Sequence, residues 1–110
     1  MPDSPSLIEF WQAEWCPHSH RVRLRLTELG IPYIACQVPV DRDERLLLEA
    51  RTGVRSIQTL VDGDTIVSGA DAILEHLDAT SEEPAAARAH RAMMREEWTH
   101  WLAQHSAIAE

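Results

Sequence analysis

Short apolar runs alternate with longer mixed segments along the chain, and this alternation predicts an α/β fold. Residues 7–11 and 33–38 are short, mainly apolar runs that suit β-strands. Two further apolar runs, at 57–61 and 65–67, are joined by a segment that contains Asp62-Gly63, a strong hairpin signal. We therefore expect two separate strands followed by a β-hairpin.

The segment 20–29 fits two patterns. Apolar residues at 22, 24 and 26 alternate with arginines as in a strand, whereas those at 22, 26 and 29 repeat at helical spacing. Gly30 follows directly and is a typical helix C-cap. The connection must also be long enough to reach back across a sheet. We therefore expect a helix here.

Two more helices complete the expected domain. Residues 41–52 begin with Asp41 as an N-cap and Glu44 three residues later, the pattern of a capping box, and Gly53 follows them. Residues 70–77 carry apolar side chains at helical spacing. The predicted order over residues 1–79 is β-α-β-α-β-β-α, an α/β (α+β) domain with a mixed sheet and crossover helices.

A last helix is expected over about residues 85–105, because this stretch is rich in alanine and other strong helix formers. Met94, Trp98, Trp101 and His105 recur near helical spacing and form one stripe. The stripe either packs on the domain's own core or contacts a second copy or a partner protein. We assign residues 80–110 to a C-terminal helical extension packed on the same domain.

The charge balance limits the classes of partner. The 110 residues carry a formal net charge of −8, whereas non-specific nucleic-acid binding and attraction to anionic membranes need basic surfaces. Two cysteines are fewer than a small secreted disulfide scaffold normally carries, and neither an amino-terminal signal nor a membrane-spanning apolar stretch is evident. We therefore expect a cytoplasmic protein with no nucleic-acid or membrane partner.

The sequence Trp15-Cys16-Pro17-His18-Ser19 follows the first strand and opens the first helix. A cysteine at a helix N-terminus faces unpaired N–H groups and the positive end of the helix dipole, which favour the nucleophilic thiolate. Pro17 suits a first helical turn because its missing N–H costs nothing there. The alternative interpretation of Cys16 is a buried, inert thiol.

The other thiol and the neighbouring imidazoles are assigned lesser roles. Cys36 lies on the apolar face of its strand, which predicts a buried structural thiol. His18 and His20 form a Cys-x-His-x-His set with Cys16, but that spacing suits a strand or loop better than a helix for shared coordination. We expect no metal, and we expect His18 to be exposed beside the thiol, where its protonated form would steady the thiolate.

The order of these motifs resembles a glutaredoxin or the N-terminal domain of a glutathione transferase. The first strand, the Trp-Cys-Pro-x-Ser motif at 15–19 and Leu-Gly-Ile-Pro-Tyr at 29–33 match the first half of that thioredoxin fold. The hairpin and the residues that follow it match the second half, so the resemblance covers residues 7–78. It implies a thioredoxin fold with a mixed four-stranded sheet.

The resemblance also implies roles for particular residues. Cys16 matches the nucleophilic cysteine of the family, and Ser19 matches the resolving cysteine of dithiol members, so the implied route uses one thiol. Gly69, Ala70 and Asp71 match the helix start that receives the glutamyl end of glutathione. A carboxylate suits that place because a helix N-terminus attracts anions.

The wall opposite the cysteine differs from the family pattern. Gln58, followed by Thr59, stands where the family has a cis-proline whose geometry presents backbone groups to the thiol ligand. A cis bond before a non-proline residue costs about 2.5–4 kcal/mol. We therefore expect a trans bond at Gln58, and we assign Gln58 and Thr59, with Gly69, Ala70 and Asp71, to the site that binds the thiol ligand.

The expected function is that of a monothiol glutaredoxin-like thiol-disulfide oxidoreductase. Its co-substrate would be glutathione or a similar low-molecular-weight thiol, and its substrate a thiol-containing protein. The alternative is a non-catalytic thioredoxin-fold binding module that forms a homodimer or docks a partner through Trp98 and Trp101. A complete glutathione transferase site is not expected, because the helical second domain of those enzymes is much longer than residues 85–110.

Overall fold

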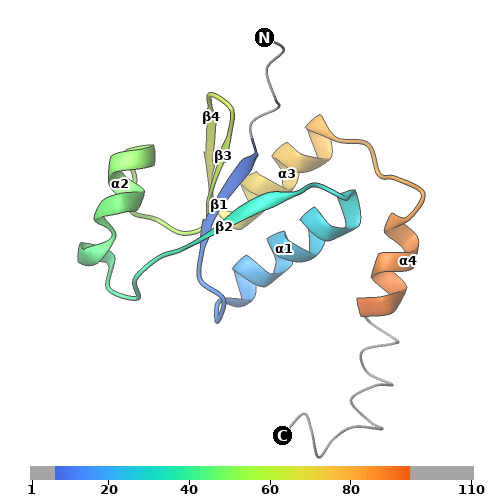
Figure 1. The fold of residues 1–110 in the computed structure, drawn as a ribbon, viewed down its shortest axis with the longest axis horizontal. Helices are drawn as coiled ribbons and strands as arrows, with labels where there is room; N and C mark the ends of the chain where they lie inside the picture. Colours follow the sequence, from blue (N-terminus) through green and yellow to red (C-terminus); the bar gives the residue numbers. More distant parts are fainter. Residues whose placement is uncertain (1–6, 95–110) are drawn as a thin grey trace, which may run out of the picture.

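The computed structural model describes residues 7–94, and its elements follow the predicted order β-α-β-α-β-β-α with one further helix at the end (Figure 1). This confirms the expected architecture. The strands are β1 (Ile8–Gln12), β2 (Tyr33–Gln37), β3 (Thr59–Asp62) and β4 (Thr65–Ser68). The helices are α1 (Pro17–Leu29), α2 (Leu46–Thr52), α3 (Ala70–Thr80) and α4 (Ala87–Ala92), and a short 3-10 helix, η1 (Arg42–Glu44), precedes α2.

The four strands form one mixed sheet in the order β2-β1-β3-β4. β1 pairs in parallel with β2, and α1 supplies the crossover connection that a parallel pair requires. β1 also pairs antiparallel with β3, with Trp11 opposite Thr59. The end of β1 therefore lies beside the beginning of β3, and this register positions the loop that follows β1.

The core lies between one face of the sheet and the helices α1 and α3. Its apolar side chains alternate along the strands and recur at helical spacing in the helices, as burial on one face requires. Segment 20–29 is therefore helical, as predicted, and Gly30 ends it with a φ of 67°. The fully buried members of this core are Phe10, Val22, Leu26, Leu60, Ile73 and Leu77.

The single helix expected over residues 41–52 is wrong in one respect, because η1 and α2 are separated at Arg45. Asp41 is an N-cap as predicted, and its carboxylate accepts a hydrogen bond from the Asp43 N–H at 2.9 Å. The guanidinium of Arg45 donates to three backbone carbonyls, those of Pro39, Val40 and Arg55. These contacts hold the break, and they depend on loops that helical spacing does not reveal.

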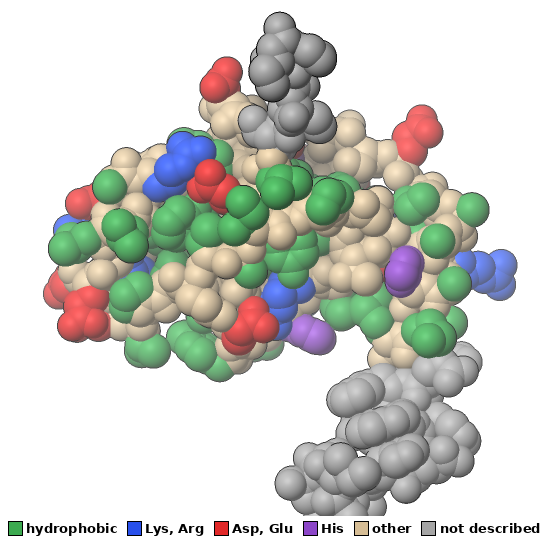
Figure 2. Space-filling view, viewed as in Figure 1, with side chains coloured by type: hydrophobic (Ala, Val, Ile, Leu, Met, Phe, Trp, Pro, Cys, Tyr) green, Lys and Arg blue, Asp and Glu red, His purple; other side chains and the backbone are tan. Residues whose placement is uncertain are grey.

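The expected burial of Cys36 is also wrong, because its side chain is only partly buried. Strand alternation places Cys36 on the face of the sheet opposite the core, together with Ile34, which is 47% exposed. Apolar side chains also gather over α2 and the segment before it (Figure 2). Val40, Leu46 and Leu47 are exposed there, so this side of the molecule carries little core.

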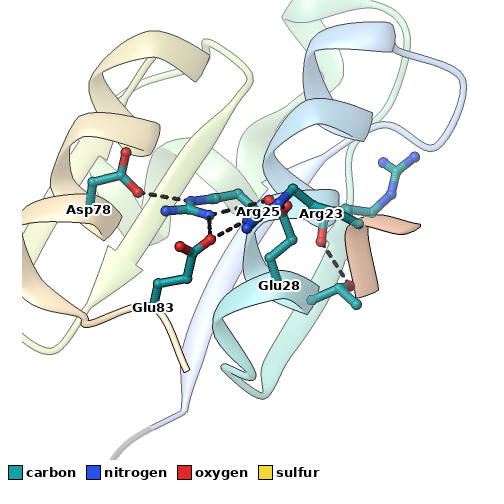
Figure 3. A network of polar contacts seen from close by, with 7 residues as sticks. Arg23, Arg25, Glu28, Asp78 and Glu83 are labelled. Carbon is teal, nitrogen blue, oxygen red and sulfur yellow. Dashed lines mark hydrogen bonds and ion pairs between the residues drawn. The ribbon is translucent and has the colours of Figure 1, made fainter. Parts of the chain in front are cut away.

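An ion-pair network fastens α1 to α3, to the segment after α3 and to α4 (Figure 3). Arg25 of α1 contacts Asp78 at 2.9 Å and Glu83 at 3.2 Å. Glu28, one turn further along α1, contacts Arg91 of α4 at 3.0 Å. Opposite charges that are partly buried and shared among several partners stabilise more than isolated surface pairs, so this network holds α4 against α1.

The last predicted helix begins at Ala87 in the structure, and Ala87 is buried. Trp98, Trp101 and His105 of the expected stripe lie outside the described residues. Within residues 7–94, no helix is both long enough and apolar enough to cross a membrane.

The network predicts an asymmetric response to loss of single arginines. Arg25→Met should lower the free energy of unfolding by about 1–2 kcal/mol, because three carboxylates lose a partly buried partner. Arg88→Met is the matched control, since Arg88 is an exposed arginine of α4 outside the network. Urea denaturation of both variants measures the difference, and an equal loss in both would contradict the role of the network.

Candidate functional site

Cys16 occupies the N-cap position of α1, with Pro17 at the first helical position. Its φ of −82° and ψ of 124° are extended, as an N-cap requires, and its carbonyl accepts a hydrogen bond from the His20 N–H at 3.0 Å. The residue is 8% exposed. The predicted placement of Cys16 at the start of the helix is therefore confirmed.

Two buried polar side chains accompany the Cys16 sulfur. Gln58, which directly precedes β3, donates from Nε2 to Cys16 Sγ at 3.1 Å and to Ser19 Oγ at 3.3 Å. Ser19 Oγ also accepts from the Ala13 N–H at 3.4 Å. Gln58 is 6% exposed and Ser19 is fully buried, so these polar groups bond mainly with one another rather than with water.

This environment favours the thiolate. Burial alone would raise the pKa of the Cys16 thiol, but the backbone groups of Ser19 and His18, the Ser19 hydroxyl and the Gln58 amide together lower that pKa below its ordinary value. Each of these groups is a neutral dipole. His18 contributes through its backbone, while its imidazole is exposed, so the expected help from a protonated His18 side chain is not what lowers the pKa.

The peptide bond between Ile57 and Gln58 is cis, so the expected trans bond is wrong. The expectation considered only the intrinsic preference of the bond. In the folded chain the Gln58 carbonyl accepts from the Gly69 N–H at 2.8 Å, while the Gln58 side chain contacts Cys16 and Ser19. These contacts come from distant parts of the sequence and fix both ends of the residue.

The start of α3 lies beside Gln58. The Gly69 N–H bonds to the Gln58 carbonyl, and the Thr59 and Ser68 hydroxyls are 2.9 Å apart across the hairpin. The structure thus joins Gln58 and Thr59 to the helix start that contains Gly69 and Ala70. Through Gln58 this helix start is also linked to Cys16.

Two of the predicted site residues lie at the rim rather than in the buried cluster. Asp71 is exposed and pairs with Arg21 of α1 at 3.0 Å. Trp15, next to Cys16, is 64% exposed. Arg21 was not among the predicted residues, because only the folded structure brings α1 and the start of α3 together.

Gln12 is a supporting residue that the sequence interpretation missed. It ends β1 and is fully buried, and its Nε2 donates to Glu14 at 2.9 Å while its Oε1 accepts from Arg23. Arg23 also pairs with Glu14 at 3.3 Å. These contacts hold the loop that carries the chain from β1 to Cys16. A glutamine at the end of a mainly apolar strand was the only signal.

Among the residues that the structure describes, no group of three or more histidine, cysteine, aspartate or glutamate side chains could hold a metal ion. His18 and His20 are both exposed. The arrangement at Cys16 instead suits thiol chemistry, because a buried sulfur with several donors is prepared to carry negative charge.

Comparison with known proteins defines the class of this domain. Residues 11–85 match the family described as "Glutathione S-transferase, N-terminal domain". The match covers more than half of the chain, and the chain belongs to that family. The expected resemblance to the N-terminal domain of a glutathione transferase, with a thioredoxin fold, is therefore confirmed.

The relatives include two curated proteins of Arabidopsis thaliana, Glutathione S-transferase U2 and Glutathione S-transferase U1. Each is 32% identical over 78 residues, which are 71% of this chain and 33% and 34% of the respective relative. The chain thus spans about a third of the length of these relatives.

Solved structures share the fold. Rice GST1 in complex with glutathione has a TM-score of 0.61 at 22% identity, over 92% of this chain and 49% of that one. A glutathione transferase homolog from Drosophila mojavensis with bound glutathione has a TM-score of 0.61 at 21% identity, over 68% of this chain and 35% of that one. At these identities the likeness concerns the fold.

The pKa values of the two cysteines should lie on opposite sides of that of an ordinary thiol. The pKa of Cys16 is lowered as described above, whereas burial and the nearby Glu9 carboxylate raise the pKa of Cys36. Cys16 alone is measured in Cys36→Ser, and Cys36 alone in Cys16→Ser. We expect the pH midpoint for alkylation by iodoacetamide to be lower for Cys16 than for Cys36. The reverse order would contradict the described site.

Proposed function

We propose that this domain is a glutathione-linked thiol-disulfide oxidoreductase that uses Cys16 as its only reacting thiol. The observation that carries the proposal is the buried Cys16 sulfur at the start of α1, to which the Gln58 side-chain amide donates a hydrogen bond. Position 19 holds a serine, and Cys36 lies on the other face of the sheet. A one-thiol route therefore fits the chain better than an intramolecular disulfide.

Glutathione is the proposed small thiol because the chain belongs to a glutathione transferase family and two solved relatives carry bound glutathione. The start of α3 would receive its glutamyl carboxylate. The first hydrogen bond within α3 runs from the Ile73 N–H to the Gly69 carbonyl, so the amides of Ala70 and Asp71 precede it and can serve an anion. The Asp71 carboxylate would attract the glutamyl ammonium group.

The proposed reaction has two thiol-exchange steps. The Cys16 thiolate attacks the glutathione sulfur of a glutathionylated protein, a new disulfide forms between Cys16 and glutathione, and the protein thiolate leaves and takes a proton from water. A second glutathione thiolate then attacks the bound glutathione sulfur. Glutathione disulfide forms, and Cys16 leaves as a thiolate. Over the two steps the disulfide between the protein and glutathione is reduced to a protein thiol, and two glutathione units are oxidised to glutathione disulfide.

A reducing cytoplasmic compartment is part of this proposal, because it would keep Cys16 reduced and supply glutathione. A glutathionylated protein would be the natural substrate. The exposed Trp15 beside the thiol offers an apolar surface on which such a substrate could rest.

Activity should depend on one cysteine only. With a glutathionylated peptide and glutathione as substrates, coupled to glutathione reductase and NADPH, Cys16→Ser should fall to the uncatalysed rate. Cys36→Ser is the matched control and should keep the parental rate, because Cys36 lies away from the site. Turnover that survives in Cys16→Ser, or a parent protein without turnover, would overturn the proposed function.

A groove beside α1 bears on the second interpretation, in which the C-terminal extension docks a partner or a second copy of the chain. It is lined by Leu24 of α1, by Leu74 of α3 and by Met93 and Met94 after α4, with charged side chains at its edges. Met94, the last described residue, lines this groove, and Trp98 and Trp101 follow it in the sequence within seven residues. We propose that the extension, residues 80–110, packs on its own domain with these tryptophans over the groove. Self-association is the competing arrangement.

Polar substitution of the tryptophans separates the two arrangements. If the pair covers the groove of its own chain, Trp98→Arg/Trp101→Arg should lower the urea midpoint while sedimentation shows the same mass as the parent. Arg88→Met serves again as a control for substitution in the C-terminal region. If the parent sediments as a dimer and the double variant as a monomer, the binding-module alternative gains support instead.

A further inference from the structure

Gln58 contacts the cysteine sulfur with a group that its backbone could not supply. Its Nε2 lies 3.1 Å from Cys16 Sγ and 3.3 Å from Ser19 Oγ. The residue is anchored from the other side, because its carbonyl accepts from the Gly69 N–H at 2.8 Å. A primary amide is thus held beside the sulfur atom, where it can act chemically as a hydrogen-bond donor as well as fill space.

The two hydrogens of the amide match the two acceptors that face it. A glutamine Nε2 has two N–H bonds, and here Nε2 lies within hydrogen-bond distance of two acceptors, Cys16 Sγ and Ser19 Oγ. A neutral thiol is a weak acceptor, whereas a thiolate is a strong one, because hydrogen bonds to charged groups are about twice as strong. The contact with Sγ thus stabilises the charged form of Cys16 more than the neutral form.

The same amide also contacts Ser19. The lone pairs of the Ser19 hydroxyl accept from the Ala13 N–H and from Gln58 Nε2. Contacts with Ser19 on one side and with the Gly69 N–H on the other therefore hold Gln58 in place at the sulfur.

Reversal of the amide would remove this stabilisation. Oε1 would then lie against Sγ and Ser19 Oγ, and a carbonyl oxygen repels a thiolate. The observed orientation therefore fits the charged form of Cys16. It also suits the cluster as a whole, because no described buried side-chain nitrogen or oxygen lacks a hydrogen-bond partner.

We propose that Gln58 is a thiolate-stabilising residue, whose side-chain amide donates directly to Cys16 Sγ. In its catalytic meaning this inference rests on the proposed function, because Sγ is there both the attacking atom and the leaving atom. In the proposed reaction Sγ carries negative charge before the first step and again after the second. A donor fixed at 3.1 Å therefore raises the fraction of thiolate that is available for the initial attack, and it also favours the release of glutathione disulfide.

The first test replaces Gln58 in a Cys36→Ser background. Gln58→Met keeps the length of the side chain and removes both donors. The pH dependence of iodoacetamide alkylation should show the Cys16 midpoint shifted upward by about one unit, which is a roughly tenfold smaller thiolate fraction at neutral pH. Ser19→Ala is the matched comparison, and we expect a smaller shift because the direct contact between Gln58 Nε2 and Sγ is kept.

An unchanged Cys16 midpoint in Gln58→Met would show that the contact between Gln58 Nε2 and Sγ does not stabilise the thiolate, and it would overturn the inference.

A second measurement needs no variant at Gln58. In the ¹⁵N-labelled parent, the side-chain amide resonances of Gln58 should move with pH at the same midpoint as Cys16, and in Cys16→Ser they should not. If the Gln58 amide resonances do not shift when Cys16 titrates, the inference is overturned, even if Gln58→Met fails to fold.

The outcomes for this inference and for the proposed function are separate. A shifted Cys16 midpoint in Gln58→Met without glutathione-dependent turnover by the parent would sustain the thiolate contact and reject the proposed reaction. Turnover by the parent together with an unshifted Cys16 midpoint in Gln58→Met would support the proposed reaction and reject the thiolate contact.

Discussion

The antiparallel pairing of β1 with β3 is the constraint on which the site depends. The register sets Trp11 opposite Thr59, so the loop after β1 and the residue before β3 must meet at one edge of the sheet. Cys16 and Gln58, 42 residues apart in sequence, come into hydrogen-bond contact for this reason. The β3–β4 hairpin then brings Gly69 to the other side of Gln58. One strand register thus assembles the sulfur, its donor and the start of α3.

The site solves an electrostatic problem without a cation. A buried thiolate is unfavourable unless donors replace the water that it has lost. Here the donors are backbone amides in the first turn of α1, a hydroxyl and a primary amide. The chain has no lysine, and its arginines near α1 pair with carboxylates such as Asp71, Asp78 and Glu28. Fixed dipoles, rather than a positive side chain, lower the pKa of Cys16.

The sequence predicts well those features that depend on neighbouring residues. Gly30 marks the end of α1, Asp41 caps η1, and the turn with Gly63 joins β3 to β4, because each depends on local backbone chemistry. The position of Cys16 at a helix start follows in the same way. The order of the elements was also predictable, since apolar periodicity distinguishes strands from helices over most of the domain.

The features that sequence could not predict all depend on distant contacts. The break at Arg45 is held by carbonyls of other loops, and the exposure of Cys36 depends on how little of the second sheet face is covered. The Gln58 side chain is the clearest case. As a departure from a family pattern it predicted an altered pocket wall, but its amide becomes a partner of Cys16 only when β1 and β3 pair.

The neutral character of the donors at Cys16 has a consequence for the response of the protein to salt. Dissolved ions screen exposed charges beyond about 8–10 Å at ordinary ionic strength and beyond about 3 Å at 1 M. Only concentrated salt therefore acts on the arginine–carboxylate pairs that hold α3 and α4 to α1, which are about 3 Å apart. The 3.1 Å contact between the Gln58 amide and the Cys16 sulfur is buried and its donor is neutral. We therefore expect concentrated salt to weaken the attachment of α4 while the reactivity of the cysteine persists.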